Sequence, residues 1–519
     1  MPHATGANAA PSGVPVEMKS KLRNRFYEPI VLLLALNEAW KHNLAPKVLD
    51  QTSDVTAQTT EQLFRDFMNM LAQICDNKPK GTTVTAAVAI QYNDRVQYRF
   101  ASNERSEKEL EQLKNFVEDI LNSLGAWTRA TNDRVRASIL RKIVSFNRLR
   151  LQAYVRAIYT QSQECLNSPE NSVTTQTRET LNKLQELALE ADNRGVDEMA
   201  FFASVTYLTA FVRRLSKSET WGIIRDKANM ENGQALPWGK LRHAAGRLLS
   251  YFHVVKTLLE ARKRWDRLFF EFEVLCLPSS TALSNPISRK DVTGEEIIGR
   301  MTSDQGKAAT YRRIVHDLQF HFDVDREVRA KTQAKKLTTI VHAEILIHES
   351  IVNDPDLQNM HPSKFFDGYR YIGSSKPTCR LCHYYFTACA DSIVTRQTHR
   401  NLYLRWRAPD VYNDQGDKAV KRREGIINRM LVWIREDTFR TLDDKVSERR
   451  PNDSHTDPTY NRGTSLGYTE GWNECIIEGM RQLSADDTES DDHVELSNVQ
   501  GGSTEADEED GDDGGVRLS

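Results

Sequence analysis

The sequence lacks long apolar runs and is poor in cysteine. Its longest apolar stretch, residues 30–36, is far shorter than the roughly 20 residues that span a bilayer, so we expect no membrane association. The first residues carry neither the basic start nor the apolar stretch of a secretory signal. Seven cysteines are an odd number for a disulfide framework, which favours a reducing cytoplasmic or nuclear compartment. No feature of the sequence indicates an oligomeric state.

Charge is unevenly distributed along the 519 residues, whose formal net charge is −2. From Ser484 onward, 13 acidic residues accompany Arg517 as the single arginine or lysine, which gives about −12. Residues 1–483 therefore carry about +10. The acidic tail is predicted to be disordered. The basic remainder is compatible with an anionic partner, such as a nucleic acid or nucleotide substrate.

Residue patterning separates one hairpin from long helical stretches. Residues 82–92 are β-branched and apolar, Asn93-Asp94 is a typical turn, and residues 95–100 alternate, which together predict a β-hairpin. Apolar residues at three- and four-residue spacing predict helices elsewhere. We expect the following division: a disordered segment 1–18, a helical segment 19–80, the hairpin 81–103, a helical region 104–335, an α/β core 336–446, a loop with a short helix 447–483 and the acidic tail 484–519.

Two stretches of the helical region are conspicuously basic, and two interpretations of them are open. The basic residues form the solvated faces of bundle helices, or they form a surface that binds a polyanion. The second stretch is interleaved with the aromatic residues Tyr251, Phe252 and Trp265. The stretches consist of Arg129, Arg134, Arg136, Arg141, Lys142, Arg148, Arg150 and Arg156, and of Arg242, Arg247, Lys256, Arg262, Lys263, Arg264 and Arg267.

The α/β core contains His342-Ala343-Glu344 and, downstream, Cys379 and Cys382 after Pro377. These residues follow the pattern of H-x-E and a later P-C-x-x-C, which is the signature of zinc-dependent deaminases. Such chemistry needs three protein ligands, an open metal position for water, and a carboxylate that moves protons. We therefore predict that His342, Cys379 and Cys382 bind zinc and that Glu344 is catalytic.

The spacing of these residues sets conditions on the local structure. Cys379 and Cys382 are three residues apart, so they lie on one face of a helical turn. Pro377 favours a helix start there, where the helix dipole stabilises thiolates. His342 and Glu344 are two residues apart, about 200° around a regular helix. Both reach one ion only if His342 lies at the first turn.

Other interpretations of the same residues are open. The triplet H-x-E occurs again at His493-Val494-Glu495 with no cysteine after it, so the Cys-x-x-Cys pair carries most of the specificity. In one alternative, His342 is a core histidine whose hydrogen bonds are satisfied and the cysteines are ordinary buried residues. His348 is expected to be structural or exposed. A closed structural zinc is another alternative, held by Cys379, Cys382, His383 and Cys389, with His399 as a further ligand.

At these residues the chain resembles the zinc-dependent cytidine-deaminase-like superfamily, and more closely the OTT-type nucleic-acid deaminases, a family with many fungal members. The likeness rests on His342-Ala343-Glu344, on residues 371–376 leading into the Cys379/Cys382 pair, and on residues 399–409. The resemblance implies an α/β fold with a mixed sheet flanked by helices. The usual motif has proline directly before the first cysteine, whereas Thr378 intervenes here.

The superfamily also implies a β-hairpin before the H-x-E helix, yet the residues directly upstream of His342 have a helical pattern. The hairpin 81–103 fits the missing strands. We therefore expect residues 104–335 to be a large all-α insertion in the deaminase, and an independent N-terminal helical domain with its own hairpin is the alternative. In many relatives an asparagine near this point touches the sugar of the substrate, which makes Asn103 a candidate substrate-binding residue.

The predicted function is zinc-dependent hydrolytic deamination of a cytosine or adenine base in a nucleic acid or nucleotide. Zinc lowers the pKa of a bound water, and Glu344 moves protons from that water to the ring nitrogen and the leaving ammonia. The alternative is a non-catalytic, zinc-stabilised scaffold whose helical region binds protein or nucleic acid. Four aromatic residues are either stacking platforms or core: Tyr371, Tyr384, Tyr385 and Trp406.

Overall fold

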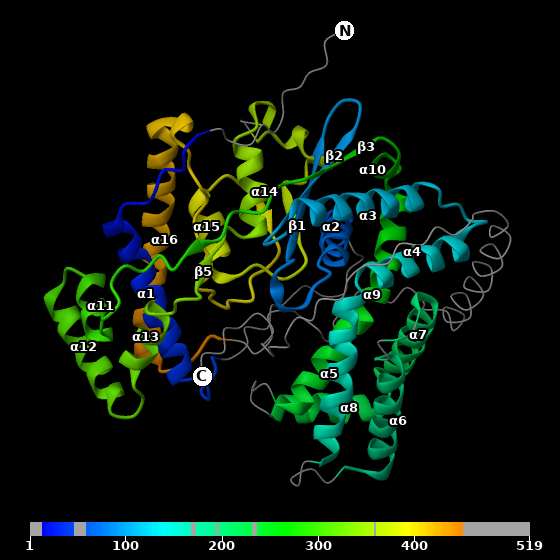
Figure 1. The fold of residues 1–519 in the computed structure, drawn as a ribbon, viewed down its shortest axis with the longest axis horizontal. Coiled ribbons are helices and arrows are strands. Elements are labelled where there is room, and N and C mark those ends of the chain that lie inside the picture. The colour runs from blue at the N-terminus through cyan, green and yellow to red at the C-terminus, as the bar shows by residue number, and fades with distance from the viewer. Residues whose placement is uncertain are drawn as a thin grey trace, which may run out of the picture.

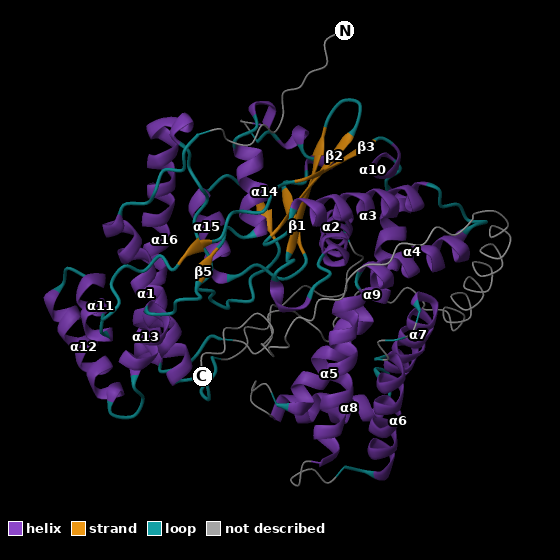
Figure 2. Ribbon diagram, viewed as in Figure 1, coloured by secondary structure: helices purple, strands orange, loops and turns teal. Residues whose placement is uncertain are grey.

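A computed structural model describes residues 13–45, 59–167, 173–192, 195, 197–230, 236–357 and 360–449. Its centre is a mixed sheet with the strand order β3-β2-β1-β6-β7 (Figures 1 and 2). The strands β1 (Thr85–Gln91) and β2 (Val96–Ser102) form the predicted antiparallel hairpin, and β3 (Phe272–Cys276) runs parallel to β2. On the other side, β1 pairs antiparallel with β6 (Tyr371–Ser374), which runs parallel to β7 (Val394–Thr395). The hairpin, which ends at Ser102, therefore belongs to the same sheet as a strand that begins only at Tyr371.

Helices cover both faces of this sheet. The helix α2 (Thr60–Cys75) packs on β1 and β6 from one side, and α14 (Ala343–Val352) packs on β1, β2 and β6. Because successive side chains of a strand point to opposite faces, Ala87 and Ala89 join one apolar core, whereas Val88 and Ile90 join another. Burial on both faces explains why β1 is a continuous apolar run instead of an alternating one.

Gly373 on β6 allows α2 to approach the sheet closely. A Cβ at this position would lie 2.6 Å from the backbone carbonyl carbon of Met68. No side chain larger than hydrogen fits between the strand and the helix without moving the backbone. The close contact places β6, and with it the segment leading to Cys379, against α2.

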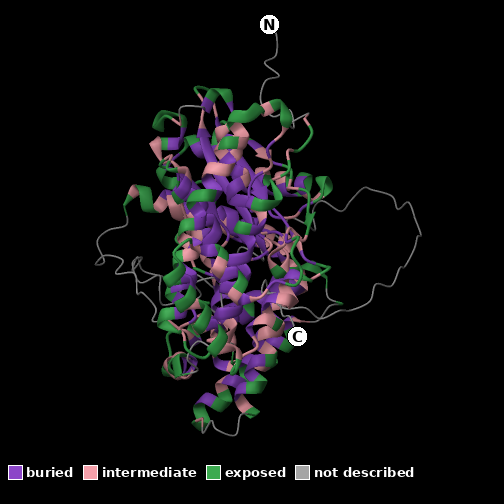
Figure 3. Cartoon of the chain, turned by 90° about the vertical axis from the view of Figure 1, so that its left-hand side faces the viewer, coloured by how far each residue is buried: buried purple, intermediate pink, exposed green. Residues whose placement is uncertain are grey.

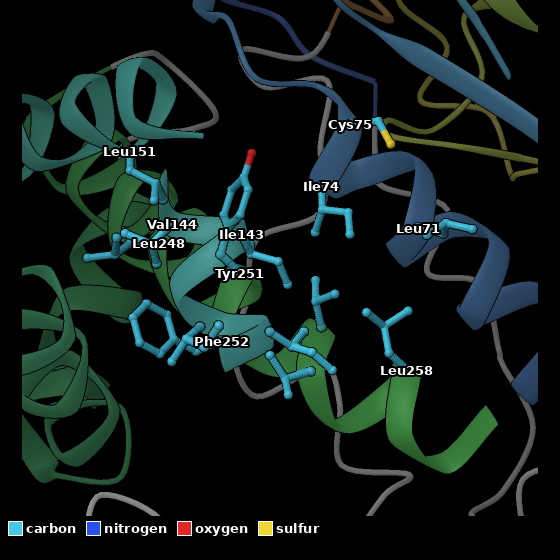
Figure 4. Close-up of a cluster of buried hydrophobic side chains, with 14 of the residues drawn as sticks. Leu71, Ile74, Cys75, Ile143, Val144, Leu151, Leu248, Tyr251, Phe252 and Leu258 are labelled. Atoms are coloured by element: carbon cyan, nitrogen blue, oxygen red, sulfur yellow. The ribbon is translucent and has the colours of Figure 1, made fainter. Parts of the chain in front are cut away.

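The helical region forms a bundle that shares its core with α2. The helix α9 runs through the bundle and contacts α2, α4, α5, α7 and α8. Figure 4 shows part of the shared core, in which Leu71 and Ile74 of α2 lie in one cluster with Ile143 of α4 and with Leu248 and Tyr251 of α9. The bundle consists of α3 (Glu107–Gly125), α4 (Asn132–Phe146), α5 (Arg148–Asn167), α6 (Thr175–Ala191), α7 (Glu198–Leu215), α8 (Glu219–Met230), α9 (Pro237–Arg264) and the short α10 (Arg267–Phe270).

A second group of helices packs around the other core. The helix α1 contacts α11, α13 and α16, and α15 contacts α16. Buried residues gather along the middle of the molecule and exposed residues lie at its periphery (Figure 3). This group consists of α1 (Ser20–Ala39), α11 (Gly294–Met301), α12 (Gln305–Gln319), α13 (Val324–Thr332), α15 (Arg380–Cys389) and α16 (Gly416–Asp444), with the short strands β4 (Leu283–Ser284) and β5 (Thr338–Thr339) paired beside it.

Two predictions of secondary structure are wrong. Residues 104–335 are not helical throughout, because β3 interrupts them and gains its hydrogen bonds by pairing with the distant β2. In residues 401–406 polar and apolar residues alternate, which predicts a strand, but these residues form none. Their one ladder contact is an isolated bridge between Trp406 and Ile340. Tertiary pairing, which is invisible to local pattern, decides both cases.

Other predictions stay open. The short helix in 447–483, the acidic tail and most of segment 1–18 lie outside the described residues, and the domain boundaries stay a prediction. Among the described residues, no helix is long and apolar enough to cross a membrane.

Candidate metal centre

Three side chains from two distant segments converge on one point. The Nδ1 of His342 lies 3.5 Å from the Sγ of Cys379 and 3.4 Å from the Sγ of Cys382. The three candidate ligand atoms all lie within 4.8 Å of one another, and all three residues are buried. The structure thus brings together the residues predicted as metal ligands in a geometry suited to a metal ion.

The starts of two helices supply these side chains. His342 is the N-cap residue of α14 and has an extended backbone (φ −71°, ψ 153°), so its side chain leaves the chain just before the helix begins. Glu344 follows within the first turn, as the two-residue spacing requires. Cys379 is the N-cap residue of α15, where its Sγ accepts a hydrogen bond from the backbone N–H of Cys382 at 3.4 Å. Helix N-termini favour the negative charge of a thiolate.

The two thiols differ in pKa. Burial opposes ionisation of both. In Cys379, a hydrogen bond with Cys382 and the charge of His342 overcome burial and hold the pKa well below its usual range. In Cys382, burial and the neighbouring Cys379 raise the pKa well above its usual range. The pocket therefore stabilises one thiolate by itself, and a second thiolate requires a cation.

Glu344 is 3% exposed and lies close enough to His342 and Cys379 for their charges to act on its carboxyl. Burial raises the pKa of its carboxyl to about 7, although the charge of His342 opposes this rise. Its Oε1 lies 3.5 Å from the hydroxyl of Ser374 on β6, at the limit of a hydrogen bond. A carboxyl beside the three candidate ligands is placed to exchange protons with a molecule bound there.

Asn103 joins the end of the hairpin to the start of α14. Its Oδ1 accepts a hydrogen bond from the backbone N–H of Ala343 at 3.0 Å, and its Nδ2 donates to the carbonyl oxygen of Gly81 at 3.2 Å. Both polar atoms of the amide are thus engaged within the protein. These contacts fix the position of α14, and with it that of His342. The contact with a substrate sugar stays a prediction.

The alternative set of four zinc ligands is not assembled in the described part of the chain. There, Cys389 groups with His348 and Asp391 and not with the Cys379/Cys382 pair. His383 belongs to neither of the two groups that the described residues form.

His348 is expected from the sequence to be either structural or exposed. It is fully buried, so it is not exposed. Its Nε2 lies 2.6 Å from Asp391 Oδ2, and its Nδ1 lies 2.9 Å from the hydroxyl of Tyr385. That hydroxyl donates to Glu349 at 2.5 Å, and Arg422 donates to the same carboxylate at 3.0 Å. The chain of contacts connects α14, α15 and α16.

The aromatic residues proposed for base stacking are mostly core. Tyr371, Tyr385 and Trp406 are buried, and Tyr384 donates a hydrogen bond to Asp437. Sequence reasoning missed Tyr403, which is partly exposed and whose ring centroid lies 6.4 Å from that of His342. Tyr403 falls within residues 399–409, one of the segments that carry the family resemblance. Its place in that segment is the sequence feature that could have identified Tyr403 as a residue near the site.

Several members of the two basic stretches hold the bundle together. Arg150 forms a buried ion pair with Asp76 at 2.8 Å. Arg262 donates to the carbonyl oxygen of Leu124 at 3.0 Å and is 8% exposed. The interleaved aromatic residues Tyr251, Phe252 and Trp265 are buried as well. For these residues, the structure favours packing of the bundle over a surface for a polyanion.

The fold and site together define a mixed α/β sheet with a candidate His/Cys/Cys metal centre at two helix starts. Residues 341–410 match the model of the OTT_1508-like deaminase family, a cytidine-deaminase-like family. The predicted resemblance is confirmed for this segment, which contains all three candidate ligands and Glu344 but not the hairpin. No curated protein matches the chain. No solved structure matches it either.

Proposed function

We propose that the protein is a zinc-dependent hydrolytic deaminase that acts on a cytosine or adenine base in a nucleic acid or nucleotide. The observation that carries this proposal is that Glu344 is buried beside the cluster of His342, Cys379 and Cys382, where the charges of His342 and Cys379 act on its carboxyl. Catalytic zinc sites have three protein ligands and an open fourth position, and structural sites are closed by four. Only a catalytic zinc site has a use for the carboxylate of Glu344.

The donor set fits zinc. Bonds of about 2.3 Å to sulfur and about 2.0–2.1 Å to nitrogen place two ligands of a tetrahedral zinc ion about 3.5 Å apart. The sulfur–nitrogen distances of 3.5 and 3.4 Å agree with this value. Imidazole and thiolate are donors that zinc prefers, and a divalent cation offsets the charge of a second thiolate.

When bound, zinc supplies a Lewis acid that brings the pKa of a coordinated water close to 7. Glu344 would take one proton from a water as its oxygen bonds to the ring carbon that bears the amino group, and would pass this proton to the ring nitrogen. It would then carry the second proton of the water to the amino group as the carbon–nitrogen bond breaks, which leaves a ring carbonyl and releases ammonia. Asn103 and Ser374 keep the pocket in shape, and Tyr403 offers an aromatic face beside His342 for the base.

A screen for released ammonia tests this function. The purified, zinc-loaded chain is incubated with cytidine, adenosine, single-stranded DNA and single-stranded RNA. We expect ammonia from at least one of them and none from the Glu344→Gln variant at equal zinc content. The zinc-stabilised scaffold predicts bound zinc without ammonia from any of the four, and that result would overturn the proposal.

A further inference from the structure

The start of α15 is held by the residue that follows its first candidate ligand. Arg380 comes directly after Cys379, and its side chain is 3% exposed. Its backbone N–H donates to the carbonyl oxygen of Asn401 at 3.0 Å, and its Nε donates to the carbonyl oxygen of Arg400 at 2.8 Å. The backbone and the side chain of this first helical residue are thus both anchored. The anchoring fixes the turn from which Cys379 and Cys382 reach the metal centre.

The rest of the Arg380 guanidinium contacts two carboxylates from further along the chain. Its Nη1 lies 3.3 Å from Oδ2 of Asp437 on α16, and its Nη2 lies 2.5 Å from Oε2 of Glu448. A buried guanidinium needs such counter-charges, because desolvation of an unpaired charge is costly. Both carboxylates lie beyond residues 341–410, which match the deaminase family. Part of the support of α15 therefore comes from a segment that the family match does not cover.

Glu448 belongs to residues 445–449, a segment that we call the clasp. The clasp follows α16 and is bound to the end of α1 and to the turn after it. Asn37 Oδ1 accepts hydrogen bonds from the backbone N–H of Glu448 and from the hydroxyl of Ser447, both at 3.0 Å. Ser447 is fully buried, and its backbone N–H donates to the carbonyl oxygen of Asn43 at 2.7 Å. These contacts hold Glu448 in place independently of its contact with α15.

The contact with α15 is the most buried of the ion pairs that Glu448 forms. Its Oε1 also lies 3.0 Å from Nη2 of Arg440 and 3.3 Å from Nη1 of Arg400, but these two side chains are 48% and 56% exposed. Ion pairs with exposed partners contribute little, because water and salt screen them. Arg380, in contrast, is almost fully enclosed by protein. We expect the loss of Glu448 to act mainly on Arg380, and so on the start of α15.

We propose that Glu448 is a positioning residue of the metal centre, which acts through Arg380 on the two cysteines at the start of α15. The inference rests on the metal centre of the proposed function, but it does not depend on deamination. Residues that orient metal ligands without binding the metal typically change metal affinity by about 10–100-fold. Glu448 lies beyond residue 446, where the sequence predicts the end of the α/β core. The support of the metal centre therefore extends to the clasp.

Metal titrations of the full-length chain test this inference. Zinc affinity is measured by competition with a chromophoric chelator, and the absorption spectrum with Co²⁺ in place of zinc reports the thiolate ligands and their geometry. The variants are Glu448→Ala, which removes the carboxylate, and Glu448→Gln, which keeps an oxygen that accepts a hydrogen bond from Arg380. The control is Glu38→Ala, the same change at the carboxylate that pairs with the next clasp residue, Arg449, at 2.9 Å.

We expect Glu448→Ala to weaken zinc binding about 10-fold and to reduce the thiolate absorption of the Co²⁺ form. Glu448→Gln should lie between this variant and the parent, because the hydrogen bond with Arg380 survives without the charge. Glu38→Ala should bind zinc as the parent does. Urea unfolding of the metal-free variants is measured in parallel, and the titrations are made under conditions in which every variant is folded.

Three results separate this inference from the proposed function. Parental zinc affinity and an unchanged Co²⁺ spectrum in Glu448→Ala overturn the positioning role, even if this variant unfolds more easily, and leave the proposed function intact. Equal zinc loss in Glu38→Ala also overturns it, because the clasp then acts through general stability. Weaker zinc binding in Glu448→Ala alone, in a chain that releases no ammonia from any substrate, supports the positioning role and overturns the proposed function.

Discussion

The side chain of Asn103 accepts a hydrogen bond from the backbone N–H of Ala343, although 240 residues separate the two positions. The contact ties the end of the hairpin to the first turn of the helix that follows His342. Between these residues the chain forms the whole helical bundle. The pairing of β1 with β6 likewise joins, within the sheet, two segments that lie on either side of the bundle in the sequence. Both observations support our proposal that the helical region is an insertion within the deaminase.

Replacement of Asn103 by alanine distinguishes a positioning residue from a substrate ligand. The variant leaves the N–H of Ala343 and the carbonyl of Gly81 without their partner, so we expect a loss of about 1–3 kcal/mol in the free energy of unfolding. Zinc affinity should fall as well, because the start of α14 carries His342. Denaturant unfolding and zinc titration without substrate measure both effects. If both equal the parental values and only KM rises, Asn103 acts on the substrate instead.

Serine at either cysteine tests the metal ligands. Loss of a residue that orients a metal ligand lowers metal affinity by up to about 100-fold, and loss of the ligand itself should lower it at least as much. We therefore expect Cys379→Ser and Cys382→Ser each to weaken zinc binding by at least about 100-fold. Serine is also a good N-cap residue, so α15 should keep its start in Cys379→Ser. Zinc content by mass spectrometry is the measurement. The control is Cys389→Ser, which should retain zinc because Cys389 belongs to another cluster. Equal zinc loss in all three variants would contradict the assignment.

The local parts of this site follow from the sequence. The helix starts at His342 and Cys379 and the hairpin that ends near Asn103 all have local signals in residue type and spacing. The pairing of β3 and the position of Tyr403 beside His342 have no such local signal. Phe272–Cys276 becomes a strand because β2 offers an open edge, and Tyr403 reaches His342 because its segment turns instead of continuing as a strand. Such long-range contacts leave no periodic trace in one sequence.

The buried ion pair of Asp76 and Arg150 should couple the bundle to the deaminase segment. Asp76 accepts hydrogen bonds from Arg150 at 2.8 Å, from Thr83 at 2.9 Å and from Ser375 at 3.2 Å. Asp76→Ala leaves a buried guanidinium without its counter-charge, which costs about 3–5 kcal/mol in the free energy of unfolding. Adding Arg150→Met should recover part of this loss, because the unpaired charge is then gone. Strictly additive effects in a double-mutant cycle would show that the pair does not couple.

Glu349 makes stability depend on pH in the acid range. Burial opposes its ionisation, but a hydrogen bond with His348 and the charge of Arg422 lower the pKa of its carboxyl to about 2. A lowered pKa stabilises the fold above the unfolded-state pKa of about 4.3, and this stability is lost as the pH falls toward 2. The contribution is on the order of 3 kcal/mol, and roughly half of it should be gone by pH 3.

Urea unfolding between pH 6 and pH 3 measures this dependence. The Glu349→Gln variant should be less stable than the parent at pH 6, and the difference should shrink as the pH falls. Glu190→Gln on the exposed face of α6 serves as the control and should follow the parent at every pH. A constant difference between Glu349→Gln and the parent would contradict the lowered pKa.

The most direct measurement of the central claim is ammonia release per bound zinc in the parent and in Glu344→Gln. The substrate is whichever base or strand the parent deaminates. Glutamine has nearly the same shape but cannot carry the proton, so the variant should bind one zinc per chain and lose at least about 100-fold in kcat. If Glu344→Gln releases ammonia at the parental rate with the same zinc content, Glu344 is not the proton carrier and the proposed mechanism is wrong.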